Sequence, residues 1–252
     1  MKERATVPPD MLDQIIHGDC LEIMRRLPDG CVDAVITDPP YCSGAITEAA
    51  RTRSNRQGVR SDSIGRFRWF VGDNMGTAGL AYLLREIAVD AKRITKPTGS
   101  LLVFCDWRMT ASLQPAIESA GWRFQNLIVW NKGQLGMGRG FRCQHELVLH
   151  FAGASPEYHH RGTANVLTHS RIPTRDRLHP TQKPEGLLED LIRVVTPNGG
   201  LVLDALCGSG TTCVAAKRLG RHWIGIDIDE TYCRKARARL RDTEAPLFAE
   251  AT

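Results

Sequence analysis

Residues Asp38-Pro39-Pro40-Tyr41 bring together groups that can hold a planar amino group. Each proline fixes its own φ at roughly −65°, removes a backbone N–H and forces the preceding residue into an extended conformation. The tetrapeptide follows a strand-like apolar run, 32–37, so it predicts a stiff loop at a strand end. Such a loop offers a carboxylate, exposed carbonyl oxygens and an aromatic face. The exocyclic amine of a nucleobase fits these groups, because it donates hydrogen bonds from a ring that can stack.

A second segment, 201–212, reads LVLDALCGSGTT and predicts a buried parallel strand followed by a glycine turn and a helix. Glycines in such a turn let a ligand approach the backbone closely. The next apolar run ends at Asp227, about 20 residues further on, where Rossmann-like units place the acid that binds ribose. Cys213 stands where a dinucleotide site usually has Gly or Ala. We therefore expect a nucleoside ligand without a pyrophosphate, such as S-adenosylmethionine.

Together these motifs resemble the DNA amino-methyltransferases, and their order resembles the β class, in which the Asp-Pro-Pro-Tyr loop precedes the cofactor glycines. The resemblance covers most of residues 15–240, including the segment 179–184, HPTQKP. It implies methyl transfer from S-adenosylmethionine to an amino group of flipped-out bases in double-stranded DNA. It assigns catalysis to the residues that form the tetrapeptide, Asp38, Pro39, Pro40 and Tyr41. The residues that it assigns to the cofactor are Asp19, Lys183, Asp204, Leu206, Gly208, Gly210 and Asp227.

The target base and the class of protein leave alternatives open. Asp38 at the start of the motif favours adenine-N6, since the cytosine-N4 members more often begin it with Ser. A protein-glutamine or RNA methyltransferase is a third enzyme alternative. Those enzymes usually have the cofactor motif first, and the motif order of this chain argues against them. A DNA- or nucleoside-binding module that has lost catalysis is the alternative from a different class. Intact motif residues argue against it.

Several motifs also have plain structural interpretations. The tetrapeptide can be an ordinary proline turn, and the glycine segment can be a tight turn without a ligand. Asp19 can cap the helix that follows it. Lys183 is more typical of a solvated or capping side chain than of a cofactor contact. The tryptophans, including Trp107, are mostly core candidates.

Arginines gather in two regions that are candidates for contact with the DNA backbone. One region is the long basic loop at 43–75, which is otherwise expected to be a solvated loop. The other lies around 152–178, a short candidate target-recognition segment. The arginines proposed to bind DNA are Arg51, Arg53, Arg56, Arg139, Arg142 and Arg175.

Composition limits the remaining possibilities. The formal charge of +5 at pH 7 is compatible with a nucleic-acid partner without requiring one. No run approaches the ~20 apolar residues of a membrane helix, and the N-terminus lacks the apolar core of a signal peptide. The 8 cysteines form no C-x-x-C pair, so we expect a reduced cytoplasmic protein without metal. The family resemblance implies a bacterial or phage-encoded protein. A homodimer and a cognate restriction nuclease remain open.

The element pattern predicts an α/β fold with a mostly parallel, doubly wound sheet and an antiparallel edge hairpin. Together with the family resemblance, it implies a circularly permuted Rossmann-like methyltransferase fold. Strands are expected at 12–17, 32–37, 100–105, 201–203 and 223–226, and the hairpin pairs 124–130 with 146–151. We expect one domain, 10–245, between flexible tails at 1–9 and 246–252. Ligands in such sheets bind at the carboxyl ends of the strands, where the motif acids fall.

Overall fold

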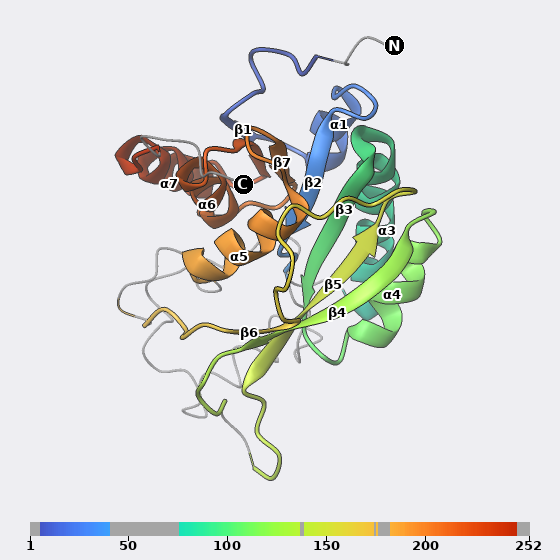
Figure 1. Cartoon of the computed structure of the whole chain (residues 1–252), viewed down its shortest axis with the longest axis vertical. Coiled ribbons are helices and arrows are strands. Elements are labelled where there is room, and N and C mark those ends of the chain that lie inside the picture. The colour runs from blue at the N-terminus through green and yellow to red at the C-terminus, as the bar shows by residue number, and fades with distance from the viewer. Residues whose placement is uncertain (1–5, 41–75, 137–138, 174, 176–181, 246–252) are drawn as a thin grey trace.

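The computed structural model describes residues 6–40, 76–136, 139–173, 175 and 182–245. They form one eight-stranded sheet with helices on both faces (Figure 1). The strands are β1 (Gln14–His17), β2 (Val32–Thr37), β3 (Thr95–Cys105), β4 (Arg123–Asn131), β5 (His145–Ala152), β6 (Val166–Thr168), β7 (Leu201–Asp204) and β8 (His222–Asp227). The described helices are α1 (Cys20–Arg25), α3 (Thr77–Ile94), α4 (Thr110–Glu118), α5 (Glu185–Val195), α6 (Thr211–Arg218) and α7 (Glu230–Asp242).

The strand order is β1-β8-β7-β2-β3-β5-β4-β6. The first five strands in this order run parallel, whereas β5 is antiparallel to both β3 and β4. The predicted α/β sheet and its hairpin are therefore confirmed. The sequence did not predict β6, which pairs parallel with β4 and forms the outer edge of the sheet. A strand of three residues is too short to show a period in the sequence.

The last two strands of the chain insert between the first two. β7 pairs with β2, and β8 pairs with both β7 and β1. This arrangement is the predicted circular permutation. It brings the tetrapeptide loop after β2 beside the glycine turn after β7, although the two are far apart in sequence.

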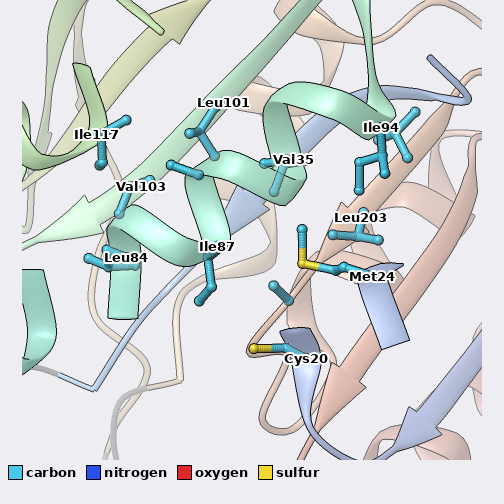
Figure 2. Close-up of a cluster of buried hydrophobic side chains, with 14 of the residues drawn as sticks. Cys20, Met24, Val35, Leu84, Ile87, Ile94, Leu101, Val103, Ile117 and Leu203 are labelled. Atoms are coloured by element: carbon cyan, nitrogen blue, oxygen red, sulfur yellow. The ribbon is translucent and has the colours of Figure 1, made fainter. Parts of the chain in front are cut away.

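Side chains alternate between the two faces of the sheet and build a core on each. On one face, Val35 packs with Leu84 and Ile87 of α3, as Figure 2 shows. On the other face, Ala34 and Ile36 pack against α5 and α6. Complete burial of one Val, Leu or Ile side chain stabilises the fold by about 1.5–3 kcal/mol. The two cores hold β2 in the middle of the sheet, so the loop that follows it starts from a fixed position.

Parts of the predicted organisation lie outside the described residues. These are the whole of the basic loop 43–75 and of the tail 246–252, and residues 1–5 of the tail 1–9. The candidate target-recognition segment 152–178 is described except for 174 and 176–178, and it contains β6. No helix in the described ranges is long and apolar enough to cross a membrane.

Candidate active site

Four predicted acids lie at the same edge of the sheet, at the carboxyl ends of four neighbouring strands. In the register of the parallel pairs, His17 lies opposite Asp227, and Asp204 lies opposite Gly225. In strand order, the acids at this edge are Asp19 after β1, Asp227 on β8, Asp204 on β7 and Asp38 after β2. The structure thus brings together acids from both ends of the sequence.

The glycine turn between β7 and α6 is organised around the buried Asp204 carboxylate. This group accepts hydrogen bonds from the Leu206 backbone N–H at 3.1 Å and the Thr212 hydroxyl at 2.6 Å. Burial raises the pKa of Asp204 to about 7, against the opposing effect of these hydrogen bonds. Gly208 and Gly210 adopt φ of 51° and 76°, a region that disfavours side chains. The turn therefore depends on both glycines and on the acid before them.

Asp227 fixes the other side of the same turn. Its carboxylate oxygens accept from the backbone N–H groups of Gly208 and Asp229, each at 2.8 Å. Burial raises its pKa, while the two backbone N–H groups oppose that shift. The next residue, Ile228, is a large apolar side chain that is 51% exposed. An acid, an apolar side chain and a glycine turn thus adjoin at one strand end.

Asp19 has the structural role of a helix cap. Its side chain accepts from the backbone N–H groups of Leu21 at 2.8 Å and Glu22 at 3.3 Å, at the start of α1. This is the capping interpretation open from the sequence. A contact between Asp19 and the cofactor adenine stays a prediction.

Lys183 is neither solvated nor a helix cap, so those two interpretations of its sequence are wrong. The residue is only 5% exposed, and its Nζ donates to Asp38 Oδ2 at 2.5 Å. Nζ also lies 3.3 Å from a carboxylate oxygen of Glu146, the second residue of β5. Two nearby carboxylates outweigh the effect of burial, which alone would lower the pKa of Lys183, and raise it. A contact of Lys183 with the cofactor remains a prediction.

Glu146 and Lys132 belong to the site and were missed in the sequence. Lys132 follows β4 and donates to Glu146 at 2.5 Å. β5 runs antiparallel to β3, so its first residues reach the edge where β2 and β3 end. The available signal was the single acid at the start of the apolar run ELVLHFA, together with the lysine that directly follows the opposing strand.

The remaining predicted residues are distributed as follows. Pro39 and Pro40 follow Asp38 directly, whereas Tyr41 and the arginines Arg51, Arg53 and Arg56 lie outside the described residues. Arg139, Arg142 and Arg175 are exposed. Of these, Arg139 and Arg142 belong to the loop of the β4–β5 hairpin, and the Arg142 guanidinium donates to the Gly136 carbonyl at 2.6 Å. Trp107, a core candidate from the sequence, is 56% exposed just beyond the end of β3.

A parallel sheet with acids and a glycine turn at its carboxyl edge, extended by an antiparallel hairpin, defines the class of Rossmann-like methyltransferases. The match to the family model described as DNA methylase spans residues 32–238. The chain belongs to this family, which comprises the N6-adenine and N4-cytosine DNA methylases.

Relatives and solved structures agree with this membership. YubD of Escherichia coli (strain K12), named as a proposed methylase, is 29% identical over 91% of this chain and 90% of its own. TTHA0409 of Thermus thermophilus, a proposed DNA modification methylase solved with S-adenosyl-L-methionine, has a TM-score of 0.66 at 21% identity, covering 95% of this chain and 99% of its own. PvuII DNA methyltransferase, which is cytosine-N4-specific, has a TM-score of 0.66 at 19% identity, covering 89% and 85%. The two structures share the fold, and family membership supports the predicted cofactor, S-adenosylmethionine.

Proposed function

We propose that the protein is a DNA methyltransferase that modifies the N6 amino group of adenine. The observation that carries the proposal is the position of Asp38. It begins the Pro-Pro segment directly after β2, on the edge that also holds the glycine turn and Asp227. An acid, rather than the Ser more common in cytosine-N4 members, begins this motif. The choice of adenine rests on this residue.

The residues around the glycine turn fit S-adenosylmethionine. The Asp227 carboxylate can accept from ribose hydroxyls, and the exposed Ile228 side chain offers an apolar surface to a purine ring. Gly208 keeps its backbone open to a ligand. Asp204 and Leu206 stabilise the turn through the hydrogen bond from the Leu206 N–H to the Asp204 carboxylate. When bound there, the cofactor supplies an electrophilic methyl group on sulfur.

Asp38 acts on the target amino group. The lone pair of an adenine amino nitrogen is delocalised into the ring, so the nitrogen is a poor nucleophile. The Asp38 carboxylate and the Pro39 carbonyl each accept one amino hydrogen, which favours a pyramidal nitrogen with a directed lone pair. Catalysis then comes from positioning and from negative charge placed where positive charge develops. The surplus amino proton leaves to Asp38 or to water.

The target base must leave the duplex to reach this edge. Tyr41 is proposed to stack on it, a contact worth about 1–3 kcal/mol in single-strand binders. The exposed arginines of the hairpin loop, and Arg175, are proposed to contact phosphates. The arginines of the basic loop keep the same proposed role.

Transfer of labelled methyl groups to mixed-sequence duplex DNA, followed by nucleoside analysis, tests the proposal. We expect N6-methyladenine, and no label with Asp38→Ala, which removes the acceptor and leaves the glycine turn intact. Label in N4-methylcytosine would establish the alternative target. Cofactor binding without transfer to any DNA would indicate a binding module and contradict the proposal.

A further inference from the structure

Four side chains of alternating charge form a continuous row that ends at Asp38. Lys132 pairs with Glu146 at 2.5 Å, Glu146 with Lys183 at 3.3 Å, and Lys183 with Asp38 at 2.5 Å. They come from the ends of β4, β5 and β2 and from the segment before α5. Two cations and two anions balance, so the row as a whole carries no net charge.

The row is built around the Lys183 ammonium. That side chain is 6% exposed, whereas the side chains of Asp38, Glu146 and Lys132 are 15% to 22% exposed. Removing an ion from water costs several kcal/mol, so a buried ammonium needs close opposite charges. Glu146 supplies the second one, and the Phe104 ring lies 5.1 Å from Nζ. The Lys132 and Lys183 cations lower the pKa of Glu146, although its burial alone would raise it. Both Glu146 and Lys183 therefore stay ionised.

We propose that Lys183 is a positioning residue for Asp38, and that Glu146 in turn positions Lys183. This inference rests on the proposed function, since it assigns these residues to the action of Asp38 on the amino group. A hydrogen bond to Oδ2 fixes the plane of the whole carboxylate. The adjacent cation also keeps the carboxylate ionised, as an acceptor of amino hydrogens must be. Lys183 transfers no proton itself.

The test is the rate of methyl transfer in a single turnover, with cofactor affinity measured separately. We expect Lys183→Met to slow transfer about 100-fold at saturating S-adenosylmethionine, where weaker cofactor binding does not contribute to the loss. Glu146→Gln should slow it about tenfold. The double variant should be no slower than Lys183→Met alone, because Glu146 acts through Lys183. Additive losses would contradict the proposed order of action.

Lys217→Met is the matched control. Lys217 Nζ donates to the Leu240 carbonyl at 2.7 Å and lies 6.0 Å from the Trp223 ring, remote from Asp38. This substitution removes a partly buried lysine that also lies over an aromatic ring but contacts a carbonyl in place of carboxylates, and we expect a normal rate. A rate in Lys183→Met equal to that of this control would overturn the proposal.

The dependence of the rate on pH separates positioning from a purely structural role. Described titratable groups around the pair are Cys105, Asp106, Lys132, Glu146 and Asp204. These groups are present in both the wild type and Lys183→Met, so a difference between the two pH–rate profiles reports the loss of the Lys183 cation. The acidic limb of the profile should move to higher pH in Lys183→Met and return in Lys183→Arg. Unchanged limbs would contradict the proposal.

A second measurement does not need activity. Carboxyl ¹³C titration, with the Asp38 signal identified by its loss in Asp38→Asn, should show the Asp38 carboxyl protonating at higher pH in Lys183→Met than in wild type. If wild-type protein methylates no DNA, the proposed function fails while this titration still decides the pairing. If wild type is active and both readouts are unchanged in the variant, the positioning role alone fails.

Discussion

Asp227 and Asp229 lie two residues apart at the end of β8, yet their carboxylates have different tasks. Asp227 accepts from Gly208 in the glycine turn, whereas Asp229 caps α7 by accepting from the Thr231 N–H at 2.7 Å. The pair therefore supplies a variant and its own control. Asp227→Ala and Asp229→Ala each remove one carboxylate at the end of β8, but only the Asp227 carboxylate contacts the glycine turn.

For Asp227→Ala we expect S-adenosylmethionine to bind at least about tenfold more weakly, measured by titration calorimetry. Charge-assisted hydrogen bonds contribute about 1.5–3 kcal/mol each, and a tenfold change corresponds to about 1.4 kcal/mol. Asp229→Ala should cost about 1 kcal/mol of stability as a lost cap and leave the affinity unchanged. Equal affinities in the two variants would place the ribose site elsewhere.

The raised pKa of Asp204 predicts how its contribution to stability depends on pH. Burial shifts this pKa to about 7 in the folded protein, from 3.8 as the reference value. Between these values the folded state binds the proton and the unfolded state does not. The contribution of Asp204 is therefore complete below pH 3.8 and is lost as pH rises toward 7, by up to about 1.4 kcal/mol per pH unit.

Asp204→Asn removes this titration while keeping an oxygen that can accept from Leu206. The free energy of unfolding is measured in urea for the variant and the wild type. From pH 5 to 7, that of Asp204→Asn should rise relative to that of the wild type. The difference between the two should level off above pH 7. Other titrating groups cancel in the difference. A difference that does not change with pH would show that Asp204 ionises normally in the folded protein.

At the scale of elements, the start of α6 depends on a close contact with α7. A Cβ at Gly210 would lie 2.8 Å from the Ala236 Cβ, and Gly210 has a φ of 76°. Gly199, with a φ of 67°, has no atom within 4 Å of the same position. The two glycines share their conformation and differ in the space around them.

Gly199→Ala should therefore lose about 1–2 kcal/mol of stability from its backbone conformation alone. Gly210→Ala should lose a further 1–3 kcal/mol, roughly, because α7 must move away from the turn. Its cofactor affinity should fall as well, whereas that of Gly199→Ala should not. Urea unfolding and calorimetry give both quantities. Equal stability losses would show that α7 yields without cost.

The hairpin loop after β4 extends away from the body of the molecule in Figure 1 and exposes Arg139, Arg142 and Phe141. Replacing both arginines with Gln should weaken duplex binding at every sequence and flatten its salt dependence, since fewer counterions are released. Target choice should not change, because phosphate contacts do not read bases. The measurement is DNA affinity at several salt concentrations.

Arg25 and Arg26 provide the control for the hairpin. Their side chains are 62% and 58% exposed at the end of α1. This end of α1 lies where the parallel strands begin, away from their carboxyl ends. Replacing them with Gln removes the same charge, so an effect of net charge alone would appear in both double variants. If the two variants lose affinity equally, the hairpin makes no local contact with DNA.

At the scale of the whole molecule, the sequence predicted the elements and their order better than it predicted the site. Apolar runs with glycine or proline at their ends located the strands that carry Asp38 and Asp204, because local periodicity and turn residues determine them. Lys183 pairs with Asp38 across 145 residues of sequence, and no local pattern marks such a pairing. Glu146 reaches the site only because β5 reverses direction, which depends on the finished sheet.

The insertion of β7 and β8 between β1 and β2 also has a consequence for folding during translation. β2 is synthesised early, but its neighbour β7 begins only at Leu201, and β1 must wait for β8 at His222. At 5–20 residues per second, the delay is roughly 10 to 40 seconds. During that time the edges of β1 and β2 that later pair with β8 and β7 stay exposed to wrong pairing. The cofactor turn and Asp227 also emerge after the tetrapeptide, so the nascent chain lacks the predicted cofactor site until β8 has been synthesised.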